Sequence, residues 1–341
     1  MSTQVEVAGN PPAPTRTPAR RPRSHRWRSS GEVVALVVLV IVFTVLNPGT
    51  FATTTNLLTI LDQAALPLIV GVGATLVILM GSIDLSVEGV MGAAGMTFVL
   101  LSANSRTGTD LGPVAVLAAL AVGLALGLLL GFVHTRMRVP SFIASLGVWY
   151  VGLGVATLLF GTSGIPFLTD TDTARWSSRT TLGLPHSFWL ALLVLVAGVV
   201  VGRWTRMGRS AYAIGADQQI ARDNGIRVNR AKVAVFATAG LCSALAGVLA
   251  ALQLGAGAAT LGAGTLFLTI AAVVIGGTSL GGGRGGVLRT ALGVVMLTVL
   301  NNGLILSGVS PDIQSGVSGA VLVAAIVVAA WPHRGRLRVV K

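Results

Sequence analysis

The stretch LGPVAVLAALAVGLALGLLLGFV, residues 111–133, decides the fold, because it is a continuous apolar run without a single charged side chain. About 20 apolar residues in a helix cross the roughly 30 Å hydrocarbon core of a bilayer. Gly123, Gly127 and Gly131 recur every four residues and therefore share one helix face, where they allow close approach of a second helix. The stretch predicts a transmembrane helix whose glycines favour packing inside the chain over dimerisation.

The composition of the whole chain agrees with this prediction. Of the 341 residues, 53% are hydrophobic and only 10% are charged, and the mean hydropathy is +0.82. A soluble domain carries about 25% charged residues, which cover its core with a solvated shell. Because this chain lacks the residues for such a shell, lipid must replace water around it. The sequence therefore predicts an all-α, polytopic integral membrane protein.

Further apolar runs lie on both sides of this stretch and predict about ten transmembrane helices in total. The third and eighth runs are short and glycine-rich, so we expect them to be tilted, broken or re-entrant. The runs lie near 31–50, 64–82, 87–103, 111–133, 142–160, 187–204, 232–254, 265–280, 287–306 and 315–331. The predicted organisation is a disordered Pro/Arg-rich tail over 1–30, a transmembrane domain over 31–331 with a long loop at 205–231, and a basic tail over 332–341.

The basic residues set the orientation. The chain has 24 Lys and Arg against 11 Asp and Glu, which gives a net charge of +13. With the N-terminus inside, 21 of these 24 fall in the two tails or in inner loops, and only Arg106, Arg175 and Arg179 lie outside. The positive-inside rule therefore predicts that both termini are cytoplasmic. The basic residues are scattered over every second loop, which argues against a nucleic-acid partner.

The sequence also limits the chemistry that the chain can perform. Neither of its two lysines, Lys232 and Lys341, follows the glycine pattern of a Walker A loop, so any ATP must be hydrolysed by another chain. The single cysteine, Cys242, cannot form an internal disulfide, and the four histidines are isolated from one another. We expect no cofactor, no metal site and no enzymatic activity.

The loop at 205–231 holds a predicted short helix. Gly215 and Asp217 provide a start signal, and Asn224-Gly225 provides a stop signal. Two turns are too few to be stable alone, so such a helix needs a partner. From spacing alone, two interpretations stay open: a docking element for another protein, or an ordinary basic loop beside anionic lipid headgroups.

A few polar residues in or near the spans are candidates for a translocation path. Asp84 lies in the segment GSIDLSVEG, residues 81–89, where a carboxylate is costly and hence a functional candidate. We favour a capping role for Asp84 before the following helix, with Ser86 assisting. Gln253, Asn301 and Asn302 could line a hydrophilic path or tie helices together, and the sequence does not separate these two roles.

Several of these segments together resemble the permease subunits of bacterial ABC importers of the ribose, xylose and galactoside type. The resemblance covers roughly residues 50–330, and its motifs occur in the same order as in the family. Its motifs are GSIDLSV at 81–87, PSFI at 140–143 followed by LG at 146–147, the loop Gly208–Lys232, the glycine-rich turn Gly276–Gly285 and the helical segment Leu300–Leu304. Glu88 departs from the family pattern, in which a small residue is expected, and the Pro/Arg-rich tail lies outside the resemblance.

The resemblance implies a function. Two permease subunits, identical or paralogous, form a path through the bacterial plasma membrane, and an extracytoplasmic binding protein delivers a monosaccharide to them. Cytoplasmic ATPase subunits act on the short helix of the loop, which makes docking the favoured interpretation. The residues that correspond to the ATPase-coupling loop are Ala213, Gly215, Asp217, Ala221, Arg222 and Gly225.

Other transport functions remain as alternatives. The same scaffold could carry nucleosides, branched-chain amino acids or a furanosyl signalling molecule. An ion-coupled secondary carrier would work without partners, but few charges lie within the spans and no inverted repeat is evident.

Overall fold

A computed structural model describes residues 25–310, 313–314, 316–317, 319–320 and 323. Nearly all of the regular structure in this part of the chain is helical. The elements are α1 (His25–Leu46), α2 (Thr54–Leu79), α3 (Val87–Leu101), α4 (Pro113–Arg136), α5 (Ser141–Phe160), α6 (Thr171–Ala174), β1 (Thr180–Thr181), β2 (Leu184–Pro185), α7 (His186–Trp204), α8 (Arg206–Ala216), α9 (Gln218–Asp223), α10 (Val228–Leu254), α11 (Thr265–Ile275) and α12 (Val287–Leu306).

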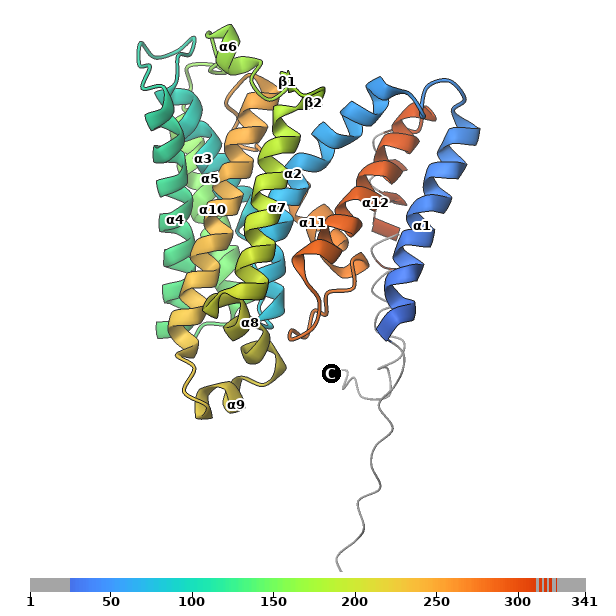
Figure 1. Ribbon diagram of the computed structural model, residues 1–341. Helices are drawn as coiled ribbons and strands as arrows, with labels where there is room; N and C mark the ends of the chain where they lie inside the picture. The colour runs from blue at the N-terminus through green and yellow to red at the C-terminus, as the bar shows by residue number, and fades with distance from the viewer. Residues whose placement is uncertain (1–24, 311–312, 315, 318, 321–322, 324–341) are drawn as a thin grey trace, which may run out of the picture.

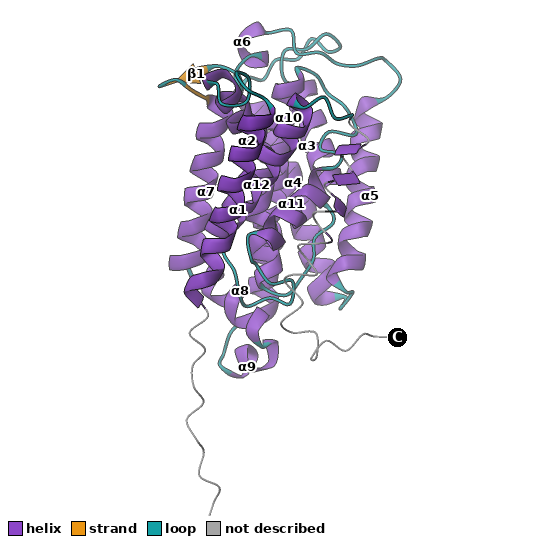
Figure 2. Cartoon of the chain, turned by 90° about the vertical axis from the view of Figure 1, so that its right-hand side faces the viewer, coloured by secondary structure: helices purple, strands orange, loops and turns teal. Residues whose placement is uncertain are grey.

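The long helices form a bundle with two distinct ends (Figure 1). Helices α8 and α9 project from one end, called here the α9 end, and α6 with the small β1–β2 hairpin covers the other, called here the α6 end. Helix α10 packs against α2, α3 and α4, while α1 packs against α12 at the side of the bundle. A view turned by 90° shows the same two ends, with the long helices running between them (Figure 2).

Within the described residues, six helices are long and apolar enough to cross a membrane: α2, α4, α5, α7, α10 and α12. Three apolar helices are shorter, namely residues 31–46 of α1, α3 and α11. This composition confirms the predicted all-α, polytopic membrane protein, including the shortness of the third and eighth runs. The tenth predicted run, 315–331, and both predicted tails lie mostly outside the described residues. The predicted disorder of residues 25–30 is wrong, because these residues form the start of α1.

The predicted start of the second span, near residue 64, is wrong by ten residues, because α2 already begins at Thr54. The Thr53 hydroxyl caps this earlier start by accepting the Asn56 N–H at 3.2 Å. Asp62 and Gln63 interrupt the apolar run and concealed the helix in the sequence. The helix continues through Asp62 because that carboxylate has hydrogen-bond donors on two neighbouring helices.

The glycine spacing in α4 produces close helix packing against α10. A Cβ atom on Gly123 or Gly127 would overlap the backbone of α10, and one on Gly240 would overlap the Gly123 carbonyl oxygen. The two helices therefore meet backbone to backbone, as small residues permit in lipid. This confirms the prediction that these glycines serve packing within the chain.

We predict that Gly240→Ala destabilises the protein by about 1–3 kcal/mol, since its methyl group has no room against α4. The matched control is Gly154→Ala in α5, where an added Cβ meets nothing within 4 Å. The thermal unfolding midpoint in detergent should fall for the first variant and stay level or rise slightly for the second. Equal midpoints for the two variants would contradict the close packing of α4 on α10.

Candidate functional site

Helices α3 and α11 are both too short to cross a bilayer, and their N-termini meet. Helix α3 has 15 residues and α11 has 11, against the roughly 20 that a span requires. The C-terminal end of α3 lies at the α6 end, where the Thr169 N–H donates to the Ala103 carbonyl at 3.0 Å. Between the two ends of the bundle, the Leu266 N–H at the start of α11 donates to Glu88 Oε1 in the first turn of α3, at 3.2 Å.

The contact of Glu88 explains why a carboxylate occupies this place. The residue that precedes α11 is Gly264, which has no side chain to cap the helix. The first N–H groups of a helix have no partner within the helix, and the helix dipole makes them favourable for a negative charge. Glu88 supplies the missing acceptor from another helix and thereby joins α3 to α11.

The chain between α10 and α11, residues 255–264, is irregular and runs along α3. It begins at the α6 end, where the Gly257 N–H donates to the Pro166 carbonyl at 2.8 Å. Farther along, the backbone at Ala259 lies against Gly92 of α3, and Gly262 contacts the side chain of Met91. Irregular backbone at membrane depth is stable only where protein buries it or where it lines a cavity.

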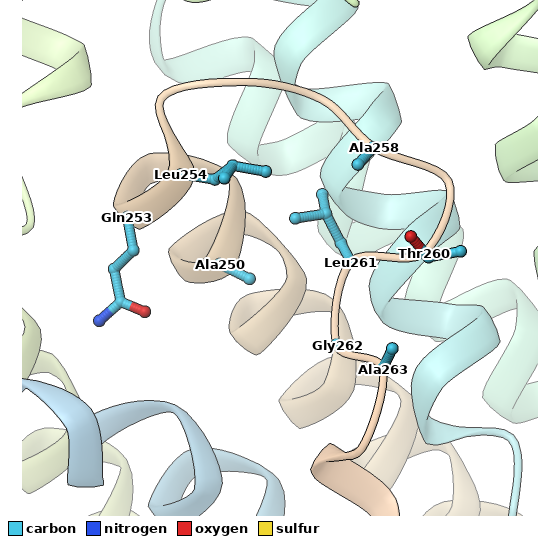
Figure 3. A pocket seen from close by; sticks show the side chains of 8 residues that line it. All are labelled: Ala250, Gln253, Leu254, Ala258, Thr260, Leu261, Gly262 and Ala263. Carbon is cyan, nitrogen blue, oxygen red and sulfur yellow. The ribbon is translucent and has the colours of Figure 1, made fainter. Parts of the chain in front are cut away.

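This irregular segment and the end of α10 do line a pocket of about 440 Å³ (Figure 3). Its walls are small and apolar apart from the side chains of Gln253 and Thr260. The full set of lining residues is Ala250, Gln253, Leu254, Ala258, Thr260, Leu261, Gly262 and Ala263. The volume falls in the range of small-molecule sites in proteins, which is roughly 300–1,000 Å³.

A polar cluster that the sequence analysis missed lies beside the pocket. The half-buried Asp62 of α2 accepts the Ser187 hydroxyl from α7 and the Gln253 amide Nε2 from α10, the latter at 3.2 Å. The same Gln253 amide also donates to the Asp62 main-chain carbonyl at 3.3 Å. Three helices thus share one carboxylate next to the pocket.

The four candidate path residues do not form one cluster. Only Gln253 lines the pocket. Asp84 is buried between α2 and α3, where it accepts the Ser86 N–H at 2.8 Å and the Ser86 hydroxyl at 2.6 Å. The predicted capping of α3 by Asp84 is wrong, because the carboxylate accepts only from Ser86 in the turn before α3, and α3 has no side-chain cap. Asn301 is half-buried and Asn302 is buried, both on α12.

The loop at 205–231 contains two helices, of which the sequence analysis predicted only α9. Asp217 caps α9 by accepting the N–H groups of Gln219 and Ile220 at 2.8 and 3.0 Å. Asn224 is the C-cap of α9 and Gly225 follows it with φ +81°, so Asp217 as the start signal and Asn224-Gly225 as the stop signal are confirmed. Gly215, which was also predicted to belong to the start signal, lies within α8 instead. The amphipathic helix α8 was missed because its glycines and arginines obscure the helical pattern.

Helix α8 ends at a junction of three glycine segments, which we call the glycine junction: Gly81, Gly215 and Gly281–Gly283. The Gly283 N–H donates to the Leu79 carbonyl at 2.8 Å, and a Cβ on Gly215 would overlap that carbonyl and approach Gly283. The Tyr212 hydroxyl donates to the Gly285 carbonyl at 2.9 Å. Burial raises the pKa of Tyr212, which keeps this donor protonated.

The glycine junction links α8 to both short helices. Gly81 belongs to the connection that leads from α2 into α3, and Gly281–Gly283 belong to the turn that follows α11. A displacement of α8 would therefore reach α3 from its N-terminal side and α11 from its C-terminal side. Of the predicted coupling residues, Ala213 and Gly215 lie on α8, Asp217, Ala221 and Arg222 belong to α9 and its cap, and Gly225 ends the segment.

Known proteins similar to this chain are transport permeases. A family model described as the permease component of the branched-chain amino acid transport system matches residues 56–326. The ribose import permease protein of Escherichia coli K12 is 38% identical over 304 residues, which cover 87% of this chain and 92% of that protein. The ribose import permease protein of Bacillus subtilis is 36% identical over 301 residues (87% and 91%), and the galactofuranose transporter permease protein of E. coli K12 is 31% identical over 323 residues (92% and 92%). No solved structure matches.

We predict that Glu88→Ala destabilises the protein by about 1 kcal/mol or more, because it leaves the N-terminus of α11 without its acceptor. Glu88→Gln retains an oxygen at the same position of the side chain and should therefore lose less stability than Glu88→Ala. Thermal unfolding midpoints in detergent, measured for the wild type and both variants, test the ranking. An alanine variant as stable as the wild type would show that the contact with Leu266 contributes nothing.

Proposed function

The chain belongs to the family of the branched-chain amino acid transport system permease components, and from this premise we propose that it is the membrane-spanning subunit of an ATP-driven importer of a monosaccharide. Its named relatives import ribose and transport D-allose or galactofuranose, which are all monosaccharides. The permease itself performs no covalent chemistry. ATP is hydrolysed by partner ATPase subunits, and an extracytoplasmic binding protein delivers the sugar.

The single observation that carries the coupling mechanism is the glycine junction. In this proposal the ATPase contacts α9, whose Ile220 side chain is 60% exposed among charged and polar neighbours while Ala221 is buried against the protein. Movement of α9 and α8 passes to the connection before α3 and to the turn after α11. The two short helices then move relative to one another, and the pocket between α10 and the segment 255–264 changes shape.

The orientation belongs to the same proposal. Among the described residues, the α9 end carries the arginines of the loop at 205–231 together with Arg136, Arg138 and Arg284, whereas the α6 end carries Arg106, Arg175 and Arg179. The positive-inside rule then makes the α9 end cytoplasmic. With about ten spans, both termini are cytoplasmic, the transmembrane domain covers 31–331, and the basic tails lie inside the cell.

The proposal includes a second permease subunit and the surrounding lipid. Large apolar side chains such as Leu158 and Leu193 are 83% and 66% exposed on α5 and α7, as expected for helices in contact with lipid or with another subunit. The pocket is open at the surface of the single bundle, so a second copy of the chain or a paralogue would complete the path. An ion-coupled carrier is disfavoured because the family relationship is to importer permeases.

Reconstitution tests the proposal. Proteoliposomes should contain the chain with its candidate ATPase, and uptake of labelled ribose, allose and galactose should be measured with and without ATP and the binding protein. We expect uptake only when all components and ATP are present. Uptake by the chain alone under an ion gradient would overturn the proposal.

In the same vesicles, Gly215→Ala should abolish uptake while ATP hydrolysis continues, because the added methyl group separates α8 from the glycine junction. The matched control is Gly202→Ala in α7, where an added Cβ meets nothing within 4 Å. The control should transport like the wild type. Normal uptake by Gly215→Ala would refute coupling through the glycine junction.

A further inference from the structure

Asp62, Gln253 and Thr260 have no role in the coupling mechanism, yet they lie together at one pocket. Gln253 and Thr260 line it, and Asp62 holds the Gln253 amide from the side of α2. We propose that these three residues form a binding site for a neutral polyhydroxylated ligand, through which the sugar leaves the binding protein and enters the path. This inference rests on the proposed function for the direction of transport, but its test measures ligand binding and not uptake.

The orientation of Gln253 follows from the chemistry of its partner. Both oxygens that it meets on Asp62 are acceptors, so the Gln253 nitrogen must face Asp62 and donate both of its hydrogens there. Its oxygen is then directed away from Asp62. Figure 3 shows the amide oxygen on the side of the pocket and the nitrogen on the opposite side.

Asp62 is the group that fixes this orientation. Its Oδ1 atom receives both the Ser187 hydroxyl and the Gln253 amide, and Ser187 is fully buried at the start of α7. Together with the second hydrogen bond to the Asp62 main-chain carbonyl, this contact orients the exposed Gln253 side chain. The site is thereby organised before a ligand arrives.

The pocket matches a neutral sugar rather than an anion. The Gln253 oxygen accepts a ligand hydroxyl, and the Thr260 hydroxyl can either donate or accept. The remaining walls, from Ala250 to Ala263, are apolar and suit the C–H face of a sugar ring. Among the described residues no basic side chain lines the pocket, so these walls offer a phosphate or a carboxylate no positive partner. A pocket of about 440 Å³ accommodates one monosaccharide.

The test uses a cysteine in the pocket. Cys242 is the only native cysteine and is buried, so Ala263→Cys, at an exposed lining position that offers the ligand no side-chain hydrogen bond, introduces one accessible thiol into the full chain. Its reaction with a membrane-impermeant maleimide is timed in proteoliposomes without ATPase, in the presence of D-ribose, D-allose, D-galactose or ribose 5-phosphate. Labelling of Cys242 in the same sample reports any unfolded protein.

We expect at least one of the three neutral sugars to slow labelling by about tenfold at about ten times its dissociation constant, and ribose 5-phosphate to give no protection. Gln253→Leu should abolish the protection by the sugar. The matched control is Gln63→Leu, the same change at the exposed position next to Asp62, and it should leave protection intact.

Two results would overturn the inference: labelling that none of the three sugars slows, and protection that survives Gln253→Leu. Protection by the phosphate as well would overturn the selectivity for neutral ligands. Because the labelling requires neither ATPase nor binding protein, its outcome is independent of the uptake experiment. Uptake without protection would refute only this site, whereas protection without ATP-dependent uptake would refute only the importer.

Discussion

The structure depends on the rule that backbone N–H and C=O groups inside a bilayer need partners within the protein. A full-length helix satisfies this rule by itself, but α3 and α11 end inside the bundle and cannot. The carboxylate of Glu88 resolves the conflict at the start of α11, and the glycine face of α3 receives the irregular segment 255–264. The broken helices, the pocket and the proposed path all exist because these exposed backbone groups are satisfied by neighbouring elements.

Glycines are the second feature on which the structure depends, since they let the backbone of one element contact the backbone of another. Between α4 and α10 such contacts form a tightly packed pair. At the glycine junction they bring the end of α8 against the end of α2 and the turn after α11, with no flexible side chains between them. In the proposed mechanism a displacement at α8 would pass directly through these backbone contacts, because no side-chain rotation lies between them to absorb it.

The sequence was informative wherever structure is determined locally. Apolar length predicted α12 with its bounds at 287 and 306, and cap residues predicted both ends of α9. Prediction from the sequence failed where the role of a residue depends on a partner that is distant in the sequence. Asp62 looked like the end of an apolar run because its partner Gln253 lies 191 residues away, and Glu88 looked anomalous because Leu266 lies 178 residues away. Such pairs become visible only once the helices are packed.

The most direct test of this account is whether α11 moves with ATP while the α4–α10 pair stays fixed. Spin labels would be placed at Ala263, before α11, and at Leu117, an exposed position of α4, and their distance measured by pulsed EPR in the assembled transporter. The account predicts that a non-hydrolysable ATP analogue shifts the distance distribution, and that Gly215→Ala prevents the shift. Identical distributions with and without the nucleotide in the wild type would contradict it.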